Sequence, residues 1–273
     1  MNGSKTKKLV ESAIMIALAT VLSIVKVVDM PYGGSVTLAS SLPIVIIAYR
    51  HGLGWGLSSG LVYATLQQLL GLNTLSYVTG WQSVVAVILL DYILAYTVFG
   101  LSGIFSKKAK NQHTGMVLGA LMCSVLRYVC HVVSGVTVWR EISIPASAAL
   151  TYSLIYNATY MIPDTCVLLV SVYFLGRMID FSRPAPVRIA LEKGEKRDTG
   201  YYSYLSLALL VAAVIADVIM IFPNLQDAES GVFTLANLSE VNWLAFIIVN
   251  AVCIIGAAAM LILSRVQHSE ANR

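Results

Sequence analysis

The chain has 273 residues, of which 58% are hydrophobic and 12% charged, and its mean hydropathy is +0.77. Soluble domains carry about 25% charged residues, so this apolar content requires lipid as solvent and excludes an ordinary soluble domain. The formal net charge of +4 is explained by where the basic residues lie, and it does not indicate a nucleic-acid partner. The four cysteines lie in apolar stretches without metal-ligand spacing, so we expect small buried hydrophobic side chains rather than a metal site.

Eight apolar stretches predict an all-α, polytopic membrane helix bundle. A spanning helix needs about 20 apolar residues. The predicted spans lie near 9–28, 38–50, 53–71, 83–105, 115–137, 154–178, 203–222 and 243–264. No small-residue cleavage site follows the first stretch, so we expect it to be retained as a helix rather than removed as a signal.

The basic residues predict the topology. Of the 18 lysines and arginines, Lys26 and Arg127 lie inside spans and Arg140 lies in a segment on one side. The other fifteen lie in segments or at span ends on the opposite side. The positive-inside rule therefore places both termini in the cytoplasm.

A charged linker with two prolines, 181–200, divides a six-helix core, 1–180, from a two-helix appendage, 201–273. In the appendage, Asp217 and Asn250 lie at a similar depth, which predicts that they pair; contact with a partner or a lipid is the alternative. The chain has no G-x-x-x-x-G-K-[ST] motif, so a partner would have to supply any ATP-driven step.

Ionisable side chains at membrane depth are costly and are therefore candidate functional residues. A rise of 1.5 Å per residue places Asp91 about 12 Å, and His131 about 9–12 Å, below the outer boundary, with Asn157 about 5 Å deep. These three side chains predict a cavity for a polar, cationic solute near the external face. Arg127 and Asp164 both lie about 15 Å deep, which predicts a structural ion pair, with a direct role in transport as the alternative.

Aromatic residues accompany this layer. Trp139 lies two helical turns above His131, and Gly135 lies between them on the same face, where it leaves room for a flat ligand. Aromatic faces and a carboxylate suit a cationic heteroaromatic ligand. An interfacial aromatic belt is the alternative for the tyrosines and tryptophan near this boundary, namely Tyr77, Trp81, Tyr152, Tyr156 and Tyr160.

The first span carries Ala13 and Ala17 four residues apart on one face. This small-xxx-small pattern permits close helix approach. It predicts either packing within the bundle or docking onto another membrane subunit.

Six stretches between residues 9 and 180 resemble one known family. In chain order they are ESAIMIALA, PYGGSV, YRHGLGWGL, LLDYILAY, RYVCHVVSGVTVW and YSLIYNATYMIP. Together they are similar to the thiamine-specific S component of the energy-coupling factor (ECF) transporters. The resemblance implies a six-helix, non-enzymatic subunit of a prokaryotic cell membrane that binds thiamine from outside, without a cofactor. It also implies an energising module of one membrane coupling subunit and two ATPases.

The resemblance also implies roles for individual residues. It assigns docking on the coupling subunit to Ala13 and Ala17. It assigns substrate binding to Asp91, Tyr92, His131, Gly135, Trp139, Tyr152 and Asn157.

The chain departs from the family in three places. Some members have glutamate at the position of Asp91, and some have a tryptophan in the first external loop where this chain has PYGG. Tyr77, Trp81 or Tyr32 is expected to replace that stacking partner. The segment 180–273 lies outside the resemblance.

A self-sufficient, proton-coupled transporter is the rival hypothesis. Asp91 or Asp164 would carry the proton, and only the extra helices favour this mechanism. The core shows no internal repeat, which weighs against it. An intramembrane enzyme is disfavoured because the chain has neither HExxH nor GxSxG.

Overall fold

The computed structural model describes residues 2–30, 33–140, 149–189, 200–225, 234 and 236–271. It is 81% helical, which confirms the predicted all-α membrane bundle. Two compact units divide at residue 188. In the described part of the chain, four helices are long and apolar enough to cross a membrane: Trp81–Phe105, Gln112–Thr137, Ala149–Met178 and Trp243–Ser264.

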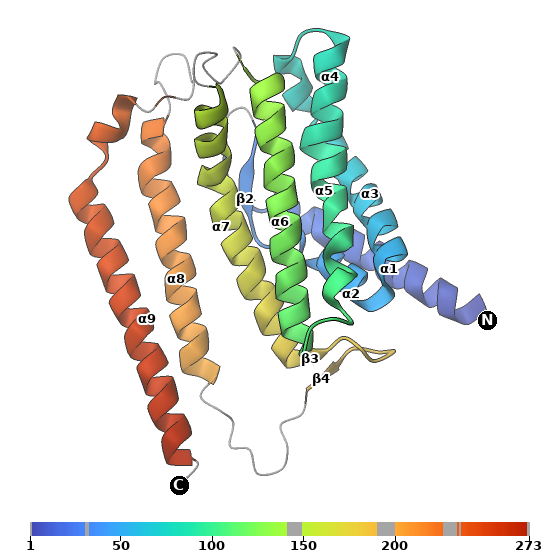
Figure 1. The fold of residues 1–273 in the computed structure, drawn as a ribbon, viewed down its shortest axis with the longest axis vertical. Helices are drawn as coiled ribbons and strands as arrows, with labels where there is room; N and C mark the ends of the chain where they lie inside the picture. The colour runs from blue at the N-terminus through green and yellow to red at the C-terminus, as the bar shows by residue number, and fades with distance from the viewer. Residues whose placement is uncertain are drawn as a thin grey trace. The chain divides into compact units, whose positions relative to one another are not determined.

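The first unit is a helix bundle with two short hairpins. In chain order its elements are α1 (Asn2–Ile24), β1 (Lys26–Asp29), β2 (Ser35–Thr37), α2 (Leu42–His51), α3 (Leu53–Leu70), η1 (Leu72–Tyr77), α4 (Trp81–Val87), η2 (Ile88–Leu94), α5 (Ala95–Thr97), η3 (Val98–Phe105), α6 (Gln112–Thr137), α7 (Ala149–Met178), β3 (Ile179–Asp180) and β4 (Val187–Arg188). α4 to η3 form one long helix, in which η2 is π-helical and η3 is a 3-10 helix. α6 and α7 run side by side (Figure 1).

The first hairpin replaces the end of the first predicted span. That span was expected to reach residue 28, but α1 ends at Ile24 and β1 pairs antiparallel with β2. The β-branched valines of VKVVD favour a strand, and a hydrogen bond from the Met30 N–H to the Gly34 carbonyl oxygen at 3.0 Å joins the two strands at the turn. Gly34 has φ +96°, and a Cβ there would lie 2.8 Å from the Tyr160 ring. Glycine therefore lets the hairpin lie directly against α7.

The helices of the first unit approach each other through glycines. A Cβ at Gly119 of α6 would lie 2.0 Å from the Ser102 carbonyl oxygen, and one at Gly103 would lie 2.1 Å from that of Ala48. Backbone cannot give way as a flexible side chain can, so η3 is held tightly between α2 and α6.

Gly119→Ala is therefore expected to lower the stability of the protein by about 1–3 kcal/mol, because the added methyl overpacks a backbone contact. Gly54→Ala is the matched control, since a Cβ there meets no atom within 4 Å and alanine favours a helix. Thermal unfolding in detergent measures both variants. Equal melting temperatures for the two would contradict the prediction.

The segment after α7 folds back onto the first unit. β3 and β4 pair antiparallel, and Arg50 of α2 donates hydrogen bonds to the carbonyl oxygens of Phe181 (2.7 Å) and Arg183 (3.2 Å). The first part of the predicted linker, to Arg188, therefore packs with the core helices.

The second unit contains α8 (Gly200–Ile221), η5 (Phe222–Leu225), η6 (Ala236–Glu240) and α9 (Trp243–Ala271). α8 and α9 pack together. Asn250 Nδ2 donates to Asp217 Oδ1 at 2.6 Å. The two polar side chains in these apolar helices thus satisfy each other, as their similar depth led us to expect.

Candidate ligand-binding site

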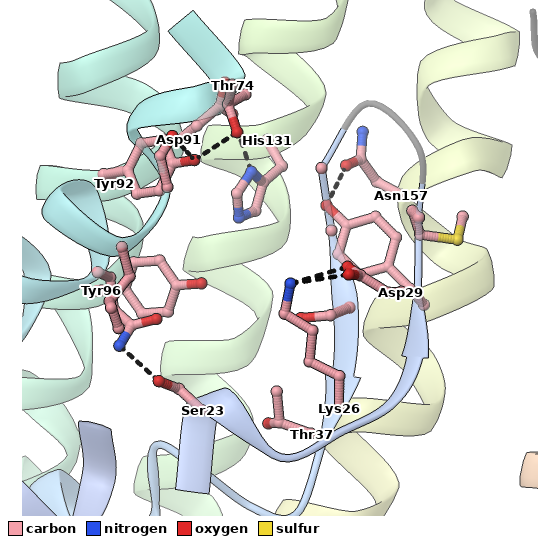
Figure 2. A pocket seen from close by; sticks show the side chains of 18 of the residues that line it. Ser23, Lys26, Asp29, Thr37, Thr74, Asp91, Tyr92, Tyr96, His131 and Asn157 are labelled. Carbon is pink, nitrogen blue, oxygen red and sulfur yellow. Dashed lines mark hydrogen bonds and ion pairs between the residues drawn. The ribbon is translucent and has the colours of Figure 1, made fainter. Parts of the chain in front are cut away.

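The first unit contains a cavity of about 740 Å³, within the range typical of small-molecule sites. Its wall is formed by the end of α1, the first hairpin, the α3–η1 region, η2 with α5, and facing turns of α6 and α7. Figure 2 shows the first hairpin close to the helices that carry Asp91, His131 and Asn157.

Six of the seven predicted binding residues line the cavity: Asp91, Tyr92, His131, Gly135, Trp139 and Asn157. Tyr152 does not belong to the lining. It packs half-buried against the apolar cluster that contains Val87 and Trp139. α7 begins at Ala149, so Tyr152 lies in its first turn, beyond the turns that face the cavity.

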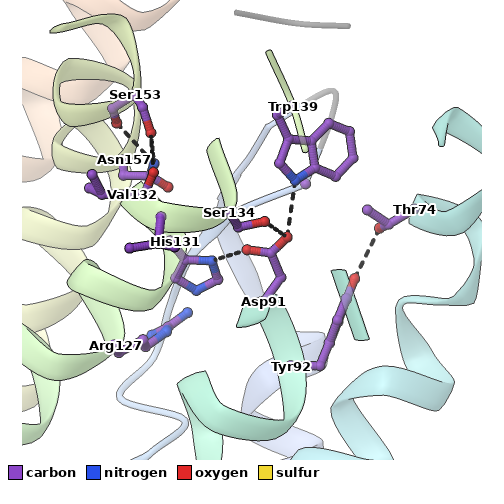
Figure 3. A network of polar contacts seen from close by, with 12 residues as sticks. Thr74, Asp91, Tyr92, Arg127, His131, Val132, Ser134, Trp139, Ser153 and Asn157 are labelled. Atoms are coloured by element: carbon purple, nitrogen blue, oxygen red, sulfur yellow. Dashed lines mark hydrogen bonds and ion pairs between the residues drawn. The ribbon is translucent and has the colours of Figure 1, made fainter. Parts of the chain in front are cut away.

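Asp91 is the centre of a buried polar network (Figure 3). Its Oδ1 lies 2.9 Å from His131 Nδ1, and its Oδ2 accepts hydrogen bonds from Ser134 Oγ (2.6 Å) and Trp139 Nε1 (3.0 Å). An ionised carboxylate only accepts, so His131 Nδ1 is the donor. Its Nε2 is buried and has no hydrogen-bond partner among the described residues, which leaves an acceptor for a ligand.

The π-helical winding of η2 brings Asp91 into this position. In a regular α-helix, Asp91 and Tyr96 would point about 140° apart, yet both line the cavity. The i→i+5 hydrogen bonds of a π-helix widen each turn, and such segments occur frequently at functional sites.

Arg127, which lines the cavity, forms an ion pair with Asp164. Arg127 Nη1 lies 2.9 Å from Asp164 Oδ2, and both side chains are buried. Asp164 Oδ1 also accepts hydrogen bonds from the backbone N and the Oγ1 of Thr37 (2.9 and 2.8 Å). The Arg127 guanidinium lies 4.8 Å from the centre of the Tyr96 ring. The pair therefore holds α6, α7 and strand β2 together.

Among the described residues, Asn157 is linked to the Asp91 network through the side chain of Tyr160. Its Oδ1 accepts a hydrogen bond from Tyr160 OH (2.7 Å), and the Tyr160 ring lies edge-on to the His131 ring, with centroids 6.3 Å apart. Tyr156 packs edge-on to Tyr160 at 6.0 Å. Tyr156 and Tyr160 line the cavity rather than forming only an interfacial belt.

Sequence reasoning missed several lining residues. Tyr96, Thr74 and Gln67 were not expected, although a polar glutamine inside an apolar span is a signal that could have been used. Tyr92 OH donates to Thr74 Oγ1 at 3.0 Å, and Gln67 Nε2 donates to Ser23 Oγ at 2.8 Å.

Of the three proposed substitutes for the loop tryptophan, one lines the cavity. Tyr77 belongs to the lining. Trp81 does not, and it is 73% exposed. Tyr32 lies outside the described residues.

The charges of the described lining leave one carboxylate without a permanent cation. Arg127 is balanced by Asp164, and Lys26 by Asp29 at 3.0 Å. Among the described residues, Asp91 accepts hydrogen bonds only from the imidazole of His131, the hydroxyl of Ser134 and the indole of Trp139. The cavity is therefore electrostatically suited to a ligand with one positive charge.

Fold and cavity together define a multi-pass helical membrane protein with an aromatic-lined polar cavity. The chain belongs to the thiamine transporter protein (Thia_YuaJ) family, whose sequence profile matches residues 9–181. Thiamine transporter ThiT of Bacillus subtilis (strain 168) is 35% identical over 189 residues, which cover 64% of this chain and 94% of the relative. The solved structure of ThiT from Listeria monocytogenes matches with a TM-score of 0.51 and 25% identity, over 63% of this chain and 94% of that one.

These comparisons confirm the resemblance seen in the sequence. The family is one of transporters and not of enzymes, so this chain takes part in thiamine uptake. The second unit lies outside the family match, which ends at residue 181.

Proposed function

We propose that this chain is the S component of an ECF importer, and that it captures thiamine from the external side in the cavity around Asp91. The supporting observation is the buried carboxylate of Asp91, which lacks a cationic partner and is surrounded by aromatic side chains. An ATP-driven partner module, with one membrane coupling subunit and two ATPases, supplies the energy. The distribution of basic residues supports cytoplasmic termini.

Thiamine is chemically suited to this cavity. Its thiazolium ring is a cation, which Asp91 attracts and which aromatic faces such as that of Trp139 bind favourably. Its aminopyrimidine ring offers an amino group, for which the unpartnered His131 Nε2 is an acceptor. Tyr156 and Tyr160 add aromatic surface for either ring.

Equilibrium titration of the purified full chain tests the proposal. Thiamine is expected to bind one molecule per chain, and a panel of its mono- and diphosphate and its free pyrimidine defines which part is recognised. Absence of thiamine binding would contradict the proposed site.

A surface formed by α1 and α3 supports the proposed partnership with an energising module. Ala13 and Ala17 are exposed and line an apolar groove of about 410 Å³ between α1 and α3, together with Ile16, Trp55 and Val62. We propose that this groove docks on the membrane coupling subunit, because small residues let helices approach closely.

Ala17→Trp is expected to fill the groove and abolish co-purification with the energising module, and with it thiamine uptake. Thiamine binding by the isolated chain should stay unchanged, since the groove is separate from the cavity. Leu18→Trp, at an exposed position of α1 outside the groove, is the control and should keep the complex. Normal assembly of the Ala17 variant would exclude this docking surface.

The rival, proton-coupled mechanism is less well supported. Asp91 and Asp164 each accept three hydrogen bonds from other residues, so both carboxylates hold contacts within the first unit. Proteoliposomes that hold this chain alone distinguish the two mechanisms. Thiamine accumulation driven by a pH gradient would support the rival.

A further inference from the structure

Ser134 links two parts of the proposed site. It is 0% exposed, and its Oγ donates to Asp91 Oδ2 at 2.6 Å. Its carbonyl oxygen accepts the backbone N–H groups of Val138 (2.7 Å) and Trp139 (3.3 Å), where α6 ends.

The Trp139 side chain returns to the same carboxylate oxygen. Trp139 Nε1 donates to Asp91 Oδ2 at 3.0 Å. The carboxylate, the serine, the end of α6 and the indole therefore form a closed ring of contacts. Figure 3 shows the two bonds by which Ser134 and Trp139 reach Asp91. Within this ring the indole and the carboxylate cannot turn independently, because the indole and the serine hydroxyl bond the same carboxylate oxygen and the backbone N–H of Trp139 bonds the serine carbonyl.

We propose that Ser134 is a positioning residue of the thiamine site, an inference that rests on the proposed function. Its hydroxyl fixes the Asp91 carboxylate beside the Trp139 indole, so that the negative charge and the aromatic face meet the thiazolium together. Hydroxyl-to-carboxylate bonds are short and strong, which suits this task.

The hydrogen bonds from the protein also determine how Asp91 acts on the ligand. Three donors from the protein already occupy the carboxylate, which has about four acceptor sites. Asp91 therefore attracts the cation mainly through space, in a buried environment that weakly screens charge. Such an attraction depends on where the charge is held, which is what Ser134 controls.

Two ligands distinguish an effect on the position of the Asp91 charge from a general disruption of the site. The first is thiamine, and the second is an analogue in which a neutral thiophene replaces the thiazolium. Ser134→Ala keeps the backbone, the Trp139 bond and the His131 bond, but it frees the carboxylate from one donor. Equilibrium titrations of the detergent-purified full chain measure both affinities.

Ser134→Ala is expected to weaken thiamine binding about tenfold and to change the affinity for the neutral analogue less than about threefold. Ser171→Ala is the control, because the Ser171 hydroxyl donates to the carbonyl oxygen of Val167 on α7 and neither residue belongs to the cavity lining. It should change neither affinity.

The outcomes distinguish this inference from the proposed function. Unchanged thiamine affinity in Ser134→Ala would overturn the inference alone, and so would an equal loss for both ligands, which indicates general disruption. No thiamine binding by the unmodified protein would overturn the proposed function and this inference with it.

Discussion

Asp91→Asn is expected to weaken thiamine binding at least tenfold, which corresponds to about 1.4 kcal/mol. The change keeps the shape of the side chain but removes its charge. It also replaces one acceptor by an amide donor. Trp139 Nε1 can only donate, so the amide oxygen must stay near Trp139 and the amide nitrogen must face His131. His131 Nδ1 then becomes an acceptor, and its Nε2 carries the proton instead.

In the variant, His131 Nε2 therefore offers the ligand a hydrogen-bond donor instead of an acceptor. His131→Ala is expected to have a similar effect, because it removes that group altogether. Asp180→Asn is the control, since its carboxylate bonds Ser182 and Arg183 and lies outside the cavity lining. Titrations of the purified variants measure all three, and unchanged affinity in both cavity variants would remove the proposed site.

Asp164→Ala is expected to destabilise the protein by about 3–5 kcal/mol, because it leaves the buried Arg127 guanidinium without its anion. The change also removes the acceptor for two hydrogen bonds from Thr37, which tie strand β2 to α7. Thermal unfolding in detergent should show a clear fall in melting temperature.

A double variant tests whether the uncompensated charge of Arg127 causes the loss of stability. Arg127→Met with Asp164→Leu removes both charges and fills part of the space, so it should be more stable than Asp164→Ala alone. If the single and double variants unfolded at the same temperature, the broken ion pair would not be the cause of the lost stability.

Much of the fold was predictable from simple patterns. Apolar lengths located the helices in their order, and glycines with prolines marked the connections. The first hairpin was missed because VKVVD continues an apolar stretch, although its valines favour a strand. The π-helical turns could not be predicted, because ILLDYIL contains no glycine or proline and the widening involves contacts of Asp91 with α6.

The lining residues that share one helix face could be predicted from their spacing in the sequence. The four-residue spacing of His131 and Gly135 placed both on the cavity, and the rise per residue placed Asp91 at a similar depth. Trp139 was expected on the same helix, yet it lines the cavity from just beyond the end of α6 at Thr137. Ser134 was missed because a lone serine in an apolar helix usually bonds its own backbone. Tyr152, which the family resemblance assigned to substrate binding, lies outside the lining, and its role in binding stays a prediction.

The π-helical turns of η2 limit how this pocket can be redesigned. Each i→i+5 bond encloses one residue more than an α-helical bond does. Losing a single residue just before Asp91 would let the helix tighten and swing the carboxylate by about 100°. The glycine-packed stretch that follows would resist any compensating rotation. Ligand preference is therefore open to change by exchanging side chains in this helix, whereas insertions and deletions there would abolish recognition.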